Sequence, residues 1–366
     1  MNNSSTGFPR NATGKSPESL QYRDKMLEQD TLRLSLPNGR RVGQPGHELA
    51  HQYLRRRMGE IGLEYFLDYD YSLHYNALHP TSEQRIGFTN LAGLIHGTNR
   101  TAMPVLIGAH YDSAIDAPCS DDNAVSIALI LRVAEILMKK TPRRNVILAF
   151  FDAEEAPFFL TESMGSIRFY RDHCKGLDFA CVIILDMIGH DFQLGIPLLD
   201  MLLPGIRKLL FIMGSESHTQ LPHIIEKAVS VTRRLRIITT LNRYIGDMSD
   251  HHAFRTGGQP YLFISKGRGR HSHRPEDGID WINFSRVRRV LDLLLEIIGL
   301  LDKAPMNRGR QTIDPYEFEI RMIRRAIGCP LPFLLRRMGF RKCSLHTRDD
   351  LDALAGKLSE LIKLQT

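Results

Sequence analysis

The segment Asn145–Glu155, with the sequence NVILAFFDAEE, decides the fold that we predict for this chain. Its first part, Val146–Phe151, is an unbroken apolar run of the length expected for a strand buried on both faces. Directly after this run come Asp152, Glu154 and Glu155. Adjacent carboxylates at a sheet edge are costly unless a cation or a shared proton offsets their charge. The segment therefore predicts a buried strand that ends at a metal site with a spare base.

Three more apolar runs of strand length also lead into polar residues. They are Pro104–Ala109, before His110 and Asp112; Phe179–Leu185, before Asp186; and Pro260–Ser265, before the loop that holds His273. Residues 123–140 carry apolar side chains at helical spacing. Strands that alternate with helices predict a mostly parallel sheet covered on both faces. In such sheets, ligands bind beyond the carboxyl ends of the strands, where all of these polar residues fall.

Shorter patterns predict the remaining elements. Helices are expected at residues 45–62, 160–174, 223–234, 285–301, 316–327, 331–340 and 347–364. Further strands are expected at residues 64–73, 85–94 and 237–242. The apolar stretch 191–223 is expected to wall the site. We therefore expect an α/β fold with a mixed, mainly parallel central sheet, helices on both faces and a helical C-terminal extension.

The distribution of charge suggests how the chain is divided. The formal net charge is +7, and residues 303–366 contribute 13 Lys and Arg against 7 Asp and Glu. We expect a flexible N-terminal arm at 1–24, a catalytic domain at 25–304 and a basic helical extension at 305–366. The extension is expected to pack on the body with its arginines in solvent. Contact with a membrane surface is the less favoured alternative, and no nucleic-acid partner is expected.

Cysteine usage and hydropathy indicate the cellular compartment. The five cysteines form no CxxC pair and argue against a disulfide framework. The first 25 residues hold no apolar run typical of a secretion signal. The longest apolar stretches are too short, or too often interrupted by charge or proline, to span a bilayer. We therefore expect a soluble, cytoplasmic protein.

Five nitrogen and carboxylate side chains form the predicted metal-ligand set: His110, Asp122, Glu155, Asp186 and His273. A set without thiolates suits zinc or a similar divalent ion and leaves room for a bound water. Five ligands exceed what one zinc needs, whereas two ions about 3.5 to 4 Å apart would use all of them. Asp122 is the expected bridge, because it approaches from a loop before a helix and not from a strand end.

Two further carboxylates have separate predicted roles. Asp112 lies two residues after His110, so on an extended chain it points the same way and can accept the second N–H of that imidazole. Glu154 then has no metal to bind. Beside an activated water, it is the predicted general base, which later passes its proton to the leaving amine.

Six motifs in order resemble the successive signatures of the M28 family of zinc peptidases. They are HYDS (110–113), SDDNA (120–124), FDAEE (151–155), LDMIG (185–189), SDHHAF (249–254) and HSHRPED (271–277). The resemblance implies a zinc exopeptidase-like fold, two Zn²⁺ ions on the same five ligands and Glu154 as base. It also implies peptide substrates with a free N-terminus. Ala153 departs from the family pattern, which more often has glycine there.

Several alternatives remain beside this interpretation. A single-zinc glutaminyl cyclase shares the fold and most motifs but typically has Trp before the last His, where this chain has Ser272. A non-catalytic binding module on the same fold is the second rival. A Cys119 nucleophile is disfavoured, because nothing else in its loop supports it. Asp250, Tyr244 and His251 are candidates for binding the substrate or bracing the site, and so is Asp277.

Overall fold

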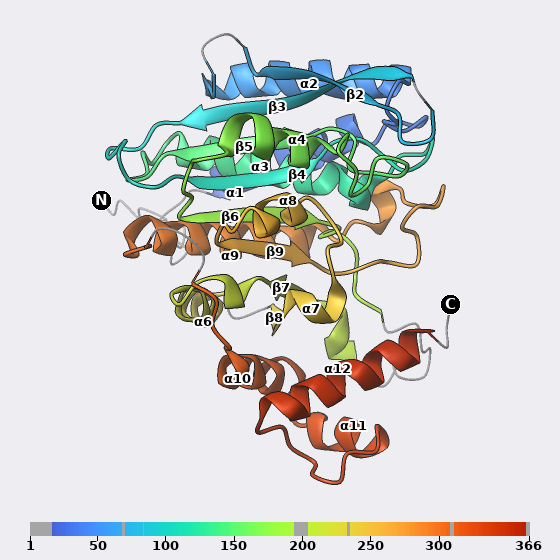
Figure 1. The fold of residues 1–366 in the computed structure, drawn as a ribbon, viewed down its shortest axis with the longest axis vertical. Helices are drawn as coiled ribbons and strands as arrows, with labels where there is room; N and C mark the ends of the chain where they lie inside the picture. Colours follow the sequence, from blue (N-terminus) through green and yellow to red (C-terminus); the bar gives the residue numbers. More distant parts are fainter. Residues whose placement is uncertain are drawn as a thin grey trace, which may run out of the picture.

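A nine-stranded mixed sheet runs through the molecule (Figure 1). The computed structural model describes residues 17–67, 70–82, 84–193, 204–232, 235–307 and 311–363. Along the sheet the order is β1-β3-β5-β4-β6-β9-β7-β8, and β2 pairs with β3 beside this path. The strands are β1 Glu64–Tyr65, β2 Ser72–Leu78, β3 Arg85–Ile95, β4 Val105–His110, β5 Val146–Phe151, β6 Cys181–Asp186, β7 Leu209–Met213, β8 Arg236–Thr240 and β9 Tyr261–Ser265.

The four central strands, β5, β4, β6 and β9, are parallel. On either side of them the pairing becomes antiparallel, at β3 with β5 and at β7 with β9. His110 pairs with Phe151 and Asp186 pairs with Ser265, so neighbouring strands end at the same level. The parallel register therefore brings the carboxyl ends of all four strands to one edge of the sheet.

Helices cover both faces of the sheet because the central strands are apolar on both sides. Along β5, Val146, Leu148 and Phe150 belong to one buried cluster, whereas Ile147 and its alternate neighbours belong to the other. The first face is covered by α1 Pro17–Leu34, α2 Pro45–Ile61, α3 Val125–Leu137, α6 Leu221–Val231 and α9 Phe284–Lys303. The second is covered by α4 Gly165–Phe169, the turn Tyr170–Cys174 and α8 His251–Thr256.

The predicted central strands agree with the structure to within two residues. The strand predicted at 64–73 is wrong for most of its length, because the chain turns after Tyr65 and re-enters the sheet as β2 at Ser72. The strand β7 was not predicted, since Leu209–Met213 lies within the apolar stretch 191–223. Residues 194–203, part of the stretch expected to wall the site, lie outside the described residues.

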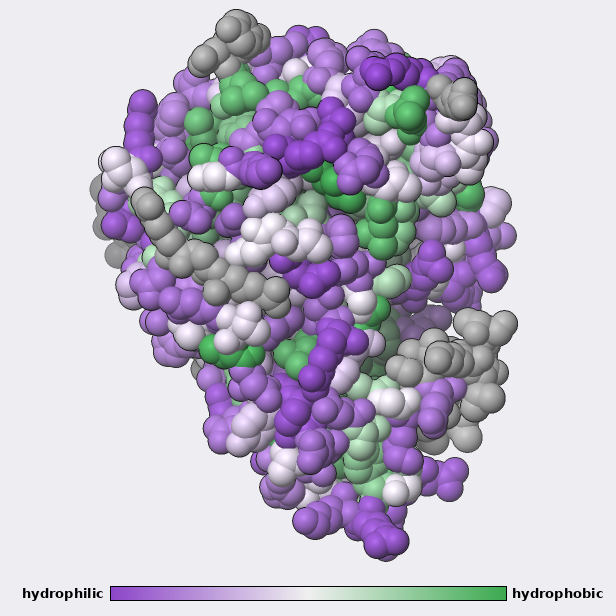
Figure 2. Space-filling model, viewed as in Figure 1, coloured by the Kyte–Doolittle hydropathy of each residue, from purple (hydrophilic) through white to green (hydrophobic). Residues whose placement is uncertain are grey.

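The C-terminal extension is helical, as predicted, and packs beside β8, the last strand in the order of the sheet. It consists of α10 Tyr316–Ile327, α11 Leu331–Arg337 and α12 Arg348–Lys363. Ile238 of β8 joins the apolar cluster of these helices, so the outermost strand is covered. On the face seen in Figure 2, the end of the molecule that these helices form is mostly hydrophilic.

The N-terminal part differs from the expected arm. The helix α1 begins at Pro17, inside the region 1–24 that we predicted to be flexible, and residues 1–16 lie outside the described residues. Leu27 and Leu34 of this helix are buried in the core. Among the described residues, no helix combines the length and the apolar character needed to cross a lipid bilayer.

Candidate metal centre

The carboxyl ends of β4 and β6 bring a histidine and an aspartate together. His110 is the last residue of β4 and Asp186 is the last residue of β6. Both are buried, and Nε2 of His110 lies 3.7 Å from Oδ1 of Asp186. Burial of two polar side chains between apolar strands is expensive unless they share a ligand or a proton. The sheet register therefore builds the first half of a candidate cation site.

Asp122 lies between the two predicted histidine ligands. It belongs to the π-helical turn Ser120–Ala124 before α3, and its backbone leaves the helical conformation with φ −115° and ψ 82°. Its Oδ1 lies 3.3 Å from Nε2 of His110, and its Oδ2 lies 3.2 Å from Nε2 of His273. Each carboxylate oxygen thus faces a different imidazole, which is the arrangement that a bridging carboxylate requires.

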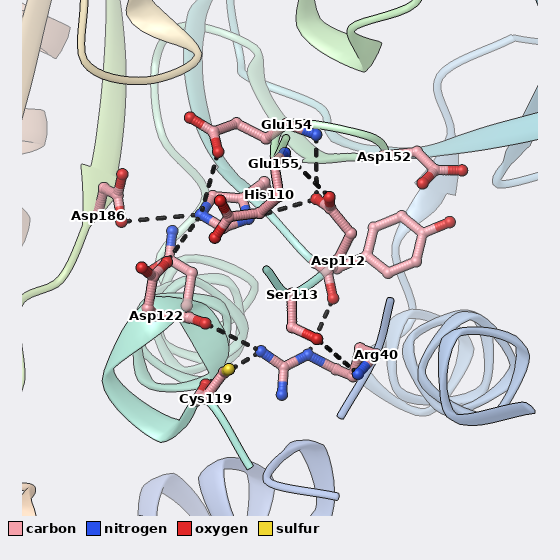
Figure 3. A network of polar contacts seen from close by, with 12 residues as sticks. Arg40, His110, Asp112, Ser113, Cys119, Asp122, Asp152, Glu154, Glu155 and Asp186 are labelled. Carbon is pink, nitrogen blue, oxygen red and sulfur yellow. Dashed lines mark hydrogen bonds and ion pairs between the residues drawn. The ribbon is translucent and has the colours of Figure 1, made fainter. Parts of the chain in front are cut away.

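Two glutamates reach the same space from the end of β5. The chain turns at Ala153, whose φ of 51° lies in the left-handed region. Oε1 of Glu155 lies 3.3 Å from Nε2 of His273. Oε2 of Glu154 lies 3.9 Å from Nε2 of His110, and Figure 3 shows this carboxylate turned toward the ring. The two neighbouring acids therefore approach different histidines.

Three groups of side chains place their ligand atoms within 4.8 Å of one another. The groups are His110, Asp122 and Asp186; Asp122, Glu155 and His273; and His110, Glu154 and Glu155. The first two groups share Asp122 alone and together contain all five side chains that the sequence analysis named as ligands. The third group adds Glu154, the predicted base, beside them.

Asp112 anchors both glutamates and one histidine. Its Oδ1 accepts a hydrogen bond from the backbone N–H of Glu154 at 3.1 Å, and its Oδ2 accepts one from the N–H of Glu155 at 3.0 Å. Oδ1 also lies 3.3 Å from Nδ1 of His110. Burial by itself raises the pKa of Asp112, but these contacts outweigh it and the pKa is lowered. Asp112 therefore stays ionised and orients its neighbours.

The electrostatics of the site favour the binding of a cation. Burial, together with Glu155, raises the pKa of Glu154 well above its usual value, despite the nearby His110. Burial and Asp122 raise the pKa of Glu155 to about 7. Contacts with Asp122 and Glu155 raise the pKa of His273 to about 10. These carboxylates crowd together more closely than their mutual repulsion favours.

The donor set fits zinc. In the described part of the chain, Nε2 of His110 and Oδ1 of Asp186 are buried without a hydrogen-bond partner. The ligand atoms are imidazole nitrogens and carboxylate oxygens, which zinc accepts. The nearby Cys119 contributes no ligand atom to the three groups. Burial raises the pKa of its thiol to about 12, which disfavours the reactive thiolate.

Asp277 ties the loop of His273 to the loop of Asp122. Its Oδ1 accepts the backbone N–H of Asp121 at 3.0 Å and its Oδ2 accepts that of Asp122 at 3.2 Å. In addition, the N–H of Ser120 donates to the Asp277 carbonyl at 3.0 Å. The sequence motif around His273 contains Asp277, so this role had a signal in the sequence.

The three other candidates for binding the substrate or bracing the site, Asp250, His251 and Tyr244, lie in different places. Asp250 is fully buried beside the cluster, and burial raises its pKa to about 7. His251 stacks on Tyr261 and Phe263 of β9, and burial lowers its pKa to about 3. The Tyr244 hydroxyl contacts the C-terminal helix α12. Of the three, only Asp250 adjoins the candidate metal centre.

One charged residue of the site was not predicted at all. Arg40 is fully buried next to the candidate metal ligands and contacts the backbone around Asp122 (Figure 3). Its position in the sequence, about 70 residues before the first motif, gave no signal of this contact. A pairing of that kind depends on the folded chain and not on local spacing.

Comparison with protein families and curated proteins places these motifs in a known group. The model of peptidase family M28 matches residues 90–298, more than half of the chain. The uncharacterized protein YfbL of Escherichia coli is 27% identical over 216 residues, which cover 53% of this chain. A probable zinc metalloprotease of Leptosphaeria maculans is 23% identical over 265 residues, which cover 63%. The matches span 66% and 61% of the lengths of these relatives.

Solved structures share the fold. A Zn-dependent exopeptidase from Parabacteroides distasonis superposes with a TM-score of 0.59 at 16% identity, covering 75% of this chain and 97% of that one. A glutaminyl cyclase from Bacteroides thetaiotaomicron gives the same TM-score and identity over the same shares. At such low identity the likeness establishes the fold alone. The zinc exopeptidase-like α/β fold that the motifs implied is therefore confirmed.

Proposed function

Because the chain belongs to peptidase family M28, we propose that it is a zinc-dependent aminopeptidase that removes residues from the free N-terminus of peptides. The observation that carries the proposal is the position of Asp122, whose two oxygens face His110 and His273 at 3.3 and 3.2 Å. That arrangement supports two metal positions that share one carboxylate.

The five predicted ligands divide between the two positions. His110 and Asp186 would hold one ion, Glu155 and His273 the other, and Asp122 both. Zinc bound there supplies Lewis acidity, which polarises the scissile carbonyl and makes a water acidic enough to attack at neutral pH. The side chain of His273 is 33% exposed, whereas the other four ligands are buried. Substrate would therefore enter on the side of His273.

Glu154 is the proposed general base. The two ligand groups that share Asp122 do not include Glu154. The carboxylate of Asp112 holds the backbone of Glu154 in place. Its carboxylate takes a proton from the attacking water and delivers that proton to the departing amine. Glu154 lies beside His110 and can hold the proton between these two transfers.

Asp250 is the proposed partner of the substrate's α-ammonium group. Its carboxylate is buried beside the cluster and makes no hydrogen bond in the described part of the chain, although the Ser166 hydroxyl lies near it. A cationic group at this place would offset the charge that burial makes costly. This pairing accounts for a preference for free N-termini.

Metal counting and peptide cleavage test the proposal together. We expect two zinc ions per chain and release of the first residue from peptides with free, but not acetylated, N-termini. Glu154→Gln should keep both ions and lose cleavage. Release of internal fragments instead would contradict the exopeptidase assignment, and a wild-type protein that binds zinc but cleaves nothing would favour a binding module.

A glutaminyl cyclase is the second candidate, because this chain shares its fold. Ser272 stands directly before His273, at the position where cyclases typically have Trp, and this favours the peptidase. A peptide with N-terminal glutamine distinguishes the two. A single zinc and formation of the cyclised peptide, with aminoacyl anilides left intact, would replace our proposal with the cyclase.

The division of the chain also remains our proposal. We place the catalytic unit at residues 25–304 and assign the helices of 305–366 a separate role. The basic stretch 320–348 contains no Asp or Glu, although Arg321 pairs with Glu226 and Arg325 donates to the carbonyl of Val229. These contacts support an extension that packs on the body.

A further inference from the structure

Arg40 is a fully buried arginine whose donors all go to backbone carbonyls. It lies in the segment between α1 and α2, outside the region that the family model matches. Its five N–H groups reach five acceptors. These are the carbonyls of Tyr111 at 2.9 Å, Leu34 at 2.6 Å, Pro118 at 2.8 Å, Cys119 at 3.0 Å and Asp122 at 3.3 Å. No donor of the guanidinium is left without an acceptor.

One of these carbonyls belongs to a candidate metal ligand, and another belongs to the residue that follows one. Tyr111 lies between His110 and Asp112, and its carbonyl accepts from Nε of Arg40. The carbonyl of Asp122 itself accepts from Nη2. One rigid guanidinium therefore holds the end of β4 and the turn before α3 at a fixed separation. That separation sets the distance between His110 and the bridging carboxylate.

The backbone of Arg40 adds a further contact to the same loop. Its N–H donates to Oγ of Ser113 at 2.7 Å, and that hydroxyl donates to the carbonyl of Ile115 at 3.0 Å. Figure 3 shows Ser113 and the guanidinium of Arg40 on the side of Asp122 that faces away from Asp186. The segment before α2 thus packs against the candidate metal ligands from one side.

We infer that Arg40 is a positioning residue of the metal centre, which sets the geometry of His110 and Asp122 through their backbone. This inference rests on the proposed metal site. Only arginine offers five donors in one plane, whereas lysine offers three on a single atom. A lysine at this position would leave at least two of the five carbonyls unpaired and would release the two ligand segments from each other.

Arg144 provides a matched control at the opposite ends of the parallel strands. It is also buried and donates only to carbonyls, those of Leu301, Met103 and Ala304 at 3.0, 3.1 and 2.7 Å. It precedes β5, so it lies at the amino ends of the parallel strands. Replacing it should cost comparable folding stability without moving any candidate ligand.

The experiment compares zinc affinity in the wild type, Arg40→Lys and Arg144→Lys. Zinc is titrated against a competing chelator, and cobalt is substituted so that its visible spectrum reports the ligand geometry. Thermal unfolding of the metal-free proteins measures stability separately. We expect Arg40→Lys to bind zinc about 10- to 100-fold more weakly, the usual loss when an outer partner of a metal ligand is changed. Its cobalt spectrum should differ from that of the wild type.

Arg144→Lys should keep the wild-type zinc affinity and cobalt spectrum even where its unfolding temperature falls. If Arg40→Lys does not fold, Ser113→Ala removes one contact of the same segment and should weaken zinc binding by a few-fold. Wild-type affinity and spectrum in the folded Arg40 or Ser113 variant would overturn the inference, as would equal losses in Arg144→Lys. A wild-type protein that binds no zinc would instead refute the proposed function.

Discussion

The two ends of the central sheet bury polar groups in different ways. At the amino ends, the carboxylate of Asp302 accepts the backbone N–H groups of Arg143 and Arg144, and the Arg144 side chain donates to three carbonyls. At the carboxyl ends, buried atoms of His110, Asp186 and Asp250 make no hydrogen bond within the described residues. Both ends belong to the same strands, so the difference lies in the residues that follow and precede those strands.

The comparison shows where buried polar groups of the protein lack partners within the described residues, so that a ligand could contact them. Buried polar groups are almost always hydrogen-bonded in folded proteins, and a partner left out costs stability. At the amino end, Asp302 and the side chain of Arg144 follow this rule through contacts within the chain. The carboxyl end departs from it with several acids side by side, and a cation bound there would supply the contacts that these acids lack. The predictions below test this difference.

The largest expected effect comes from removing the proposed base. Glu154→Gln keeps the size and burial of the side chain but removes its ability to take a proton. We expect kcat to fall by about 10²- to 10⁴-fold, the usual contribution of a general base. The amount of bound zinc should stay unchanged, because the two ligand groups that share Asp122 do not include Glu154. Steady-state kinetics and metal analysis of the same sample check this.

The exposed Glu162 provides the control for this change. Glu162→Gln should leave kcat unchanged. Loss of zinc from the Glu154 variant would show that this residue is a ligand, and unchanged kcat would remove it from the mechanism.

Removal of the metal should lower the free energy of unfolding. A ligand present at about 1,000 times its dissociation constant stabilises the folded state by about 4 kcal/mol. We therefore expect a chelator to lower the unfolding temperature and stoichiometric zinc to restore it. Calcium prefers a larger number of ligands, all of them oxygen atoms, so it should restore little of the unfolding temperature. An unfolding temperature that ignores zinc would mean that the carboxyl end holds its charges without a cation.

The pH dependence of the metal-free protein should show the cost of these charges. Burial raises the pKa of Asp250 to about 7, above the value of about 4 in an unfolded chain. Between these two values the folded state binds more protons, so stability falls as the pH rises from about 4 to 7. Asp250→Asn should remove this part of the dependence and stabilise the metal-free protein at pH 8 by at most about 4 kcal/mol.

Chemical unfolding in the presence of a chelator, at pH 5 and at pH 8, measures this difference. Asp302→Asn at the amino end is the control. Asp302 accepts two backbone N–H groups and is exposed to solvent on one side, so its replacement should not stabilise the protein at pH 8. Equal behaviour of the two variants would remove the contrast between the ends of the sheet.

The sequence predicted the central strands because each is a continuous apolar run of strand length, as expected for a strand covered on both faces. It failed at β2, which alternates buried Leu73 and Tyr75 with exposed residues, and at β7, which follows charged Arg207 and Lys208. There the pattern is weaker, and the neighbouring strand decides the structure.

The site was predictable to the extent that it lies at strand ends. All five named ligands converge, because the parallel register brings distant motifs to one edge. Arg40 was missed, since its acceptors lie up to 82 residues away along the chain. His251 belongs to a motif next to the site, yet its ring turns into the aromatic cluster of β9. Motif membership fixes the region of a residue but not the direction of its side chain.

The smallest expected effect concerns backbone strain, which also differs between the two ends. Ala153, Met187 and His273 adopt positive φ at the carboxyl end, although none is glycine. At Ala153, glycine would relieve a cost of about 1 kcal/mol, which offsets the greater freedom of glycine in the unfolded chain. Ala149 is equally buried within β5 but has no such strain. Urea unfolding should therefore show that Ala149→Gly costs about 1 kcal/mol more than Ala153→Gly. Equal costs would mean that the turn before Glu154 stores no strain, and the two ends would then differ in charge alone.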